Sequence, residues 1–147
     1  MPGALILGFD GSECASSALE AAIDLARRYD DELVIVFGIE PPVRSVGEEF
    51  AEHEKALHDI GERVTGAALK RAHEEGVPAE VALVPLRPAQ AILQVAEQRD
   101  AHMIVIGTHG ESPLRGAILG STPHKLLHLA DRPVVVVPID GGARDGG

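Results

Sequence analysis

The sequence predicts an α/β fold, a single doubly wound, Rossmann-like domain with a five-stranded parallel sheet and four helices. Two observations predict it. Short apolar runs alternate along the chain with longer segments of helical periodicity. Hydrophobic residues make up 45% of the 147 residues, yet the chain has only three Phe, one Tyr and no Trp, so the core is mostly aliphatic. Aliphatic runs are typical of parallel strands that are buried on both faces.

Five short runs rich in Val, Ile, Leu and Ala are predicted to be the strands. They lie at 4–9, 32–39, 79–85, 102–107 and 133–138. Turn residues bound them, such as Asp10-Gly11-Ser12 after the first run and Pro41-Pro42 after the second. Because a helical segment separates each run from the next, we expect parallel pairing through right-handed crossovers.

The four segments between these runs are predicted to be helices. They lie at about 12–29, 48–75, 88–99 and 121–129. Ser12 can cap the first helix, and Pro88 is suited to the first turn of the third. The second helix should end at Gly76-Val77-Pro78, since the chain cannot continue a helix through that sequence.

The domain organisation is simple. We expect one domain over 1–140 and a flexible glycine-rich tail over 141–147, with no internal repeat. The segment from Pro41 to about Gly47 is the one mobile connection expected inside the domain.

The charge and cysteine content exclude several functions. A net charge of −10 gives no long-range attraction to nucleic acid or to anionic membranes, so neither is an expected partner. A single cysteine excludes a disulfide framework and a cysteine-rich zinc site. Without a basic N-terminal region or a long apolar run, the chain is expected to be soluble and cytoplasmic.

The glycine-rich stretch GTHGESPLRGAILGST, residues 107–122, is the main functional signal. It follows the fourth predicted strand, and GFDGS follows the first, so both lie at the carboxyl edge where open sheets bind ligands. Glycines let successive backbone N–H groups point at one anion. A helix start at Gly120-Ser121-Thr122 adds further donors and a favourable dipole. The stretch therefore predicts a phosphate site that needs no lysine.

Common nucleotide motifs are missing, but one family pattern fits. The chain lacks a G-x-G-x-x-G turn after its first strand and a G-x-x-x-x-G-K-[ST] loop. Gly107, Gly110, Gly120 and Ser121 instead have the spacing G-x(2)-G-x(9)-G-[ST]. This spacing resembles the ATP-binding pattern of universal stress proteins. The opening LILGFDGSECASSALEAAIDLA and the closing DRPVVVVP extend the resemblance over nearly the whole chain.

The resemblance implies a set of ligand-binding residues on a fold of the adenine nucleotide alpha hydrolase-like type. Base and ribose would lie near Gly8, Phe9, Asp10, Gly38 and Ile106, and the phosphates near Gly107, His109, Gly110, Gly120, Ser121 and Thr122. Spacing alone leaves a second interpretation of Asp10, which can instead hydrogen bond within the turn before the first helix. Pro123 removes one N–H donor from the helix start.

The resemblance also implies a function. We expect a stress-response regulatory protein that binds ATP, with AMP or cyclic AMP as alternative ligands and a Mg²⁺ requirement left open. Family members form homodimers, often through the last strand, and the apolar run VVVVP here is suited to that contact. The alternatives are a slow ATPase that uses Asp10 or His109, and a stress-related dimer that binds no nucleotide.

Two further features favour structural roles. His124 and His128 share a helical face, but no H-E-x-x-H pattern surrounds them, so no metal site is expected. Cys14 is expected to be a small residue packed within the first helix, and no catalytic residue is predicted.

Overall fold

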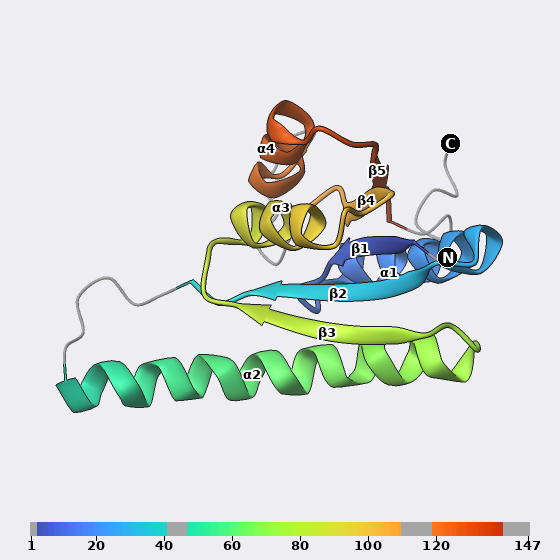
Figure 1. The fold of residues 1–147 in the computed structure, drawn as a ribbon. Helices are drawn as coiled ribbons and strands as arrows, with labels where there is room; N and C mark the ends of the chain where they lie inside the picture. Colours follow the sequence, from blue (N-terminus) through green and yellow to red (C-terminus); the bar gives the residue numbers. More distant parts are fainter. Residues whose placement is uncertain (1–2, 41–46, 110–118, 140–147) are drawn as a thin grey trace.

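The computed structural model describes residues 3–40, 47–109 and 119–139. It confirms the predicted fold, because five parallel strands form one sheet and four helices cover it (Figure 1). The elements in chain order are β1 (Ala4–Gly8), α1 (Glu13–Tyr29), β2 (Glu32–Gly38), α2 (Gly47–Glu74), β3 (Ala79–Val84), α3 (Pro88–Gln98), β4 (Met103–Gly107), α4 (Ser121–Leu129) and β5 (Val134–Val137).

The strand order β3-β2-β1-β4-β5 is what positions a site. The chain runs outward from β1 through β2 to β3 and then crosses to the other side of β1, where β4 and β5 are added. The register places Leu5 beside Met103 and Leu7 beside Val105. The order of the strands thus reverses between β1 and β4, and their carboxyl ends are where a sheet of this kind binds ligands.

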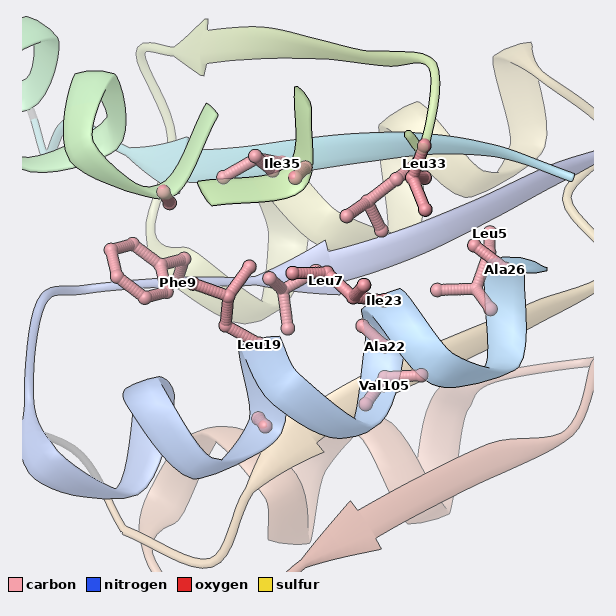
Figure 2. Packing of buried hydrophobic residues seen from close by; sticks show 14 of the residues in the cluster. Leu5, Leu7, Phe9, Leu19, Ala22, Ile23, Ala26, Leu33, Ile35 and Val105 are labelled. Carbon is pink, nitrogen blue, oxygen red and sulfur yellow. The ribbon is translucent and has the colours of Figure 1, made fainter. Parts of the chain in front are cut away.

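The two faces of the sheet pack against different pairs of helices. Side chains of alternate residues on β1 and β2, such as Leu7 and Ile35, pack against α1 and α2 (Figure 2). The intervening residues, such as Ile6 and Val34, pack against α3 and α4. All five residues of β1 are buried, because helices cover both faces of this central strand. The covering of both faces explains why the central strands β1 and β4 are uninterrupted apolar runs.

Local signals in the sequence set the helix ends as expected. Ser12 caps α1, and its Oγ accepts a hydrogen bond from the N–H of Ala15 at 3.2 Å. Pro88 is the first residue of α3, and Gly76, with a φ of 75°, follows α2 in the left-handed conformation that favours glycine. The predicted ends of the strands are less accurate, since β5 is bounded by Pro133 and Pro138 and spans only the four valines.

A buried carboxylate ties three strands together at the edge opposite the glycine-rich stretch. Asp31, just before β2, accepts a hydrogen bond from the N–H of Gly3 at 3.1 Å, just before β1. The other oxygen of Asp31 lies 2.6 Å from Nδ1 of His102, just before β4. These contacts fix the amino ends of the three central strands relative to one another.

Two expectations concern residues that the structure does not describe in full. The tail at 141–147 and the connection at 41–46 lie outside the described residues, and Gly47 already begins α2. Within the described part of the chain, no helix is both long enough and apolar enough to cross a bilayer.

Candidate functional site

A cavity of about 530 Å³ opens at the carboxyl edge of the sheet. It is lined by Gly8, Phe9, Asp10, Ala15, Val36, Phe37, Gly38, Glu40, Pro88, Ile92, Ile106, Gly107, His109, Gly120, Ser121, Thr122 and Pro123. Every residue proposed from the sequence as a ligand contact is among them except Gly110, which lies outside the described residues. Residues from near the beginning and near the end of the sequence therefore line the same cavity.

Gly8 permits the close packing at the floor of the cavity. A Cβ at this position would lie 2.5 Å from Cδ1 of Ile92 and 2.6 Å from Cδ1 of Ile106. These distances are too short for carbon atoms in contact. Glycine at the end of β1 thus lets side chains from α3 and β4 meet beneath the cavity and give it an apolar floor.

Gly38 has the same effect at the end of β2. A Cβ there would lie 2.8 Å from the carbonyl oxygen of Leu86 and 2.9 Å from Cα of Pro88. Because these are backbone atoms, they cannot rotate away as a side chain can. Glycine therefore allows the turn between β3 and α3 to pass close to β2, where Pro88 lines the cavity.

Asp10 takes part in the turn that follows β1. Its Oδ1 accepts a hydrogen bond from the N–H of Ser12 at 2.9 Å, which confirms the role in the turn. Asp10 is also among the residues that line the cavity. An ionised carboxylate has about four acceptor positions, so this one bond leaves capacity for a second partner.

A backbone hydrogen bond joins the two ends of the glycine-rich stretch. The N–H of Gly120 donates to the carbonyl oxygen of Thr108 at 2.7 Å, which holds the start of α4 beside the end of β4. The predicted use of Gly120 as a phosphate donor therefore competes with a bond inside the fold. Nearby, Oγ1 of Thr108 lies 3.2 Å from Nδ1 of His109 and 3.7 Å from Sγ of Cys14.

The first turn of α4 supplies the donors at this end of the cavity. Gly120 is the N-cap, with φ −70° and ψ 172°, and Ser121 and Thr122 follow as the first helical residues. Their N–H groups have no partner within the helix, since an α-helix leaves its first N–H groups unpaired. Pro123, the next residue, has no N–H. Ser121 and Thr122 thus offer two backbone donors and two hydroxyl groups at the positive end of a helix dipole.

The charges around the cavity are unusual for an anion site. None of the described residues that line it is Lys or Arg, whereas Asp10 and Glu40 both carry carboxylates. Any anion held among these residues would therefore depend on backbone N–H groups and the dipole of α4.

Sequence reasoning missed the contribution of α3 and of the residues after β2. Glu40 lines the cavity, and its Oε1 accepts a hydrogen bond from Nε of Arg87 at 3.1 Å. Arg87 is the N-cap residue of α3 but makes no capping bond with its side chain. The signal available was Pro88, which marks a helix start at the carboxyl edge. Because the sequence does not give the strand order, the start of α3 could not be placed beside the end of β1 in advance.

The remaining candidates lie outside the cavity lining. Cys14 is buried in α1, as expected, and its carbonyl carbon and oxygen pack against Gly107. The rings of His124 and His128 meet edge to face, with centroids 4.6 Å apart. Among the described residues, one group of potential metal ligands comes together, and its members His58, Asp59 and Glu62 are all exposed on α2.

The fold and the cavity define a class, the doubly wound α/β proteins with a ligand-sized hollow where the strand order reverses. Among solved structures, that of hypothetical protein MJ0577 has the same fold, with a TM-score of 0.86, 23% identity, and coverage of 95% of this chain and 98% of that one.

The family follows from sequence. The model of the universal stress protein family matches residues 1–138, and the chain belongs to that family. Universal stress protein YxiE of Bacillus subtilis is 32% identical over 143 residues, with 90% of this chain and 97% of YxiE covered. A Thermus aquaticus relative, named universal stress protein in QAH/OAS sulfhydrylase 3′ region, is 36% identical over 134 residues, with 90% and 96% covered.

Some solved proteins of this fold contain nucleotides. One universal stress protein was solved in complex with cAMP (TM-score 0.73, 22% identity) and one from Archaeoglobus fulgidus in complex with dAMP (0.66, 21%). A family protein from Arabidopsis thaliana was solved with AMP bound (0.69, 14%). At these identities the likeness to the present chain is one of fold.

Proposed function

We propose that the protein is a nucleotide-dependent regulatory protein of the stress response that binds an adenine nucleotide in this cavity. Its glycine spacing favours ATP, and AMP and cyclic AMP are the competing ligands. One observation carries the proposal. Ser121 and Thr122, the first residues of α4, line one end of a cavity whose other end is largely apolar.

The two ends of the cavity suit the two ends of a nucleotide. Val36, Gly38, Pro88 and Ile92 line the end formed by β2 and α3, where a flat base can exclude water from apolar side chains. The start of α4 lies on the far side of β1 and suits the phosphate. Asp10, at the end of β1 between them, can accept hydrogen bonds from ribose hydroxyl groups.

The nucleotide complexes of related proteins support the same ligand class. The ligands of those complexes, cAMP, dAMP and AMP, share an adenine base and a single phosphate. The two backbone donors of Ser121 and Thr122 can serve one phosphate group, which every candidate ligand carries in addition to its adenine base.

We propose that the bound nucleotide acts as a signal and that its hydrolysis is slow or absent. Efficient hydrolysis needs a positioned base and an activated water molecule. Asp10 already accepts the N–H of Ser12, which restricts it as a base. The competing function, a slow ATPase, requires His109→Ala to lower turnover without changing nucleotide affinity.

The proposed phosphate contact is tested by removing one backbone donor. In the variant Ser121→Pro, the N–H at the first helical position is lost while the helix is retained, because proline is favoured there. Gly120 has the extended conformation that a residue before proline requires. We expect the affinity for ATP, AMP and cyclic AMP, measured by calorimetry with and without Mg²⁺, to fall by about tenfold or more.

Ser121→Ala is the matched control. It removes the hydroxyl group but keeps the N–H, so we expect a smaller loss than in Ser121→Pro. Circular dichroism would check that α4 persists in both variants. Equal affinities of wild type and Ser121→Pro would contradict the phosphate contact, and a wild type that binds none of the three nucleotides would leave the nucleotide-free dimer as the function.

We also propose that two copies of the chain associate through β5. Within the described sheet β5 pairs only with β4, and its four valines are partly exposed. Leu127 and Leu129 of the preceding helix are 51% and 64% exposed. A second copy placed across a two-fold axis would pair with this edge and cover apolar surface.

A further inference from the structure

Glu40 is an unexpected residue in a cavity proposed to hold an anion. It lies two residues beyond β2 and is among the residues that line the cavity, and its side chain carries a carboxylate. A carboxylate near phosphate groups would weaken binding by repulsion between like charges. The effect of Glu40 on nucleotide binding therefore depends on which end of the cavity it occupies.

The sheet order places Glu40 at the end of the cavity that is remote from α4. Glu40 follows β2 on one side of β1, and the donors Ser121 and Thr122 follow β4 on the other side. Two apolar lining residues are close to Glu40: Gly38, two positions before it, and Pro88, which packs against Gly38 and follows Arg87 in the chain. A nucleotide with its phosphate at α4 would thus present its base to Glu40.

Arg87 holds the carboxylate in place. Its Nε donates to Oε1 of Glu40 at 3.1 Å, across 47 residues of sequence. Arg87 itself is not among the residues that line the cavity. The guanidinium offsets the negative charge of Glu40, and an ionised carboxylate can only accept hydrogen bonds. Among the described residues, only Oε1 of Glu40 is paired, which leaves Oε2 to accept a hydrogen bond from a ligand.

We propose that Glu40, positioned by Arg87, selects bases that carry an amino group at C6, and thus adenine over hypoxanthine. This inference rests on the proposed function, because it assigns the base end of the same cavity. Adenine presents its N6 amino group as a donor, whereas guanine has the acceptor O6 at that position. Hypoxanthine also has O6, which would face the carboxylate as a second acceptor, and this arrangement is repulsive.

The selection is tested by comparing AMP with IMP, which differ in the base alone. We expect calorimetry on the wild type to show about tenfold tighter binding of AMP, a modest factor because the Arg87–Glu40 ion pair is exposed to water. In Glu40→Gln the side-chain amide can present either its oxygen or its NH₂ group. The ratio of the two affinities should therefore fall to near one, with the affinity for AMP changed less than the affinity for IMP.

Arg87→Ala tests the positioning role, and Arg99→Ala is its matched control. Removing Arg87 leaves Glu40 present but unrestrained, so the AMP preference should weaken. Arg99 lies at the other end of α3 and pairs with Glu32 and Glu80, none of which lines the cavity. Its removal should leave the ratio unchanged, whereas an equal effect of the two substitutions would indicate a general loss of stability in α3.

The possible outcomes separate the two proposals. A wild type that binds AMP and IMP equally, or a Glu40→Gln variant that keeps the wild-type ratio, would overturn the role of Glu40 and leave nucleotide binding intact. A wild type that binds neither nucleotide would overturn the proposed function, and with it the basis of this inference.

Discussion

Gly107 shows how a single residue without a side chain controls the geometry of the site. It lies where β4 passes the first turn of α1, and a Cβ there would be 2.7 Å from the carbonyl oxygen of Cys14 and 2.9 Å from its carbonyl carbon. These are backbone atoms in a buried region. A larger residue would have to move β4 away from α1 at the point where the cavity begins.

Substitutions at two glycines should therefore have opposite effects on stability. We expect Gly107→Ala to lower the free energy of unfolding by about 1–3 kcal/mol, because the packed backbone must shift. Gly66, in the middle of α2, has open space within 4 Å of the point where a methyl group would lie, so Gly66→Ala should raise stability by about 0.5–1 kcal/mol through helix propensity. Urea unfolding of both variants checks this, and changes of the same sign would contradict it.

For single residues, the sequence predicts those roles that depend on near neighbours in the chain. The cap of Ser12 and the turn of Asp10 depend on neighbours two or three positions away, and both follow from the Asp-Gly-Ser turn. The pairing of Glu40 with Arg87 could not be predicted in this way. It joins residues 47 positions apart, and neither belongs to a recognisable motif.

Among the secondary-structure elements, β5 is the one for which we make a testable prediction. The N–H of Ile104 donates to the carbonyl oxygen of Pro133, so Pro133 and Val135 direct their backbone groups toward β4. In a parallel ladder alternate residues face alternate sides, and the N–H of Val136 therefore points away from the sheet. Since no described strand pairs with β5 on that side, we propose that this N–H bonds to a second copy of the chain.

Val136→Pro should thus disrupt the proposed dimer and spare the fold. Proline removes an outward N–H without breaking the ladder to β4, and it is tolerated on edge strands. We expect light scattering during gel filtration to give a monomer for Val136→Pro and a dimer for both the wild type and Val136→Ala, which retains the N–H. A wild type that is monomeric, or a Val136→Pro variant that stays dimeric, would rule out this contact.

The number of helices and strands and their order along the chain could be predicted from the sequence, but the order of the strands in the sheet could not. Alternating apolar runs and helical segments predicted all nine elements, because strand and helix periodicities differ strongly. The order β3-β2-β1-β4-β5 depends on contacts between residues far apart in sequence. For this reason the start of α3 could not be assigned in advance to the cavity, whereas Gly38 at the end of β2 was assigned to the site through the family resemblance.

At the scale of the whole molecule, the fold explains how an acidic protein can hold an anion. The net charge of −10 gives no long-range attraction for a phosphate, and no described lining residue is Lys or Arg. The doubly wound topology compensates by placing the positive end of α4 at the point where the strand order reverses. We propose that backbone groups there, rather than charged side chains, hold the phosphate.

We would measure the backbone amide resonances of the ¹⁵N-labelled protein during a titration with AMP. Neighbouring donors give an internal comparison, because the N–H of Gly120 is already bonded to Thr108 whereas those of Ser121 and Thr122 have no partner within the helix. We expect saturable shifts that are larger at Ser121 and Thr122 than at Gly120, accompanied by shifts at Gly8, Phe9 and Asp10. The absence of saturable shifts at the start of α4 would contradict the proposed phosphate site.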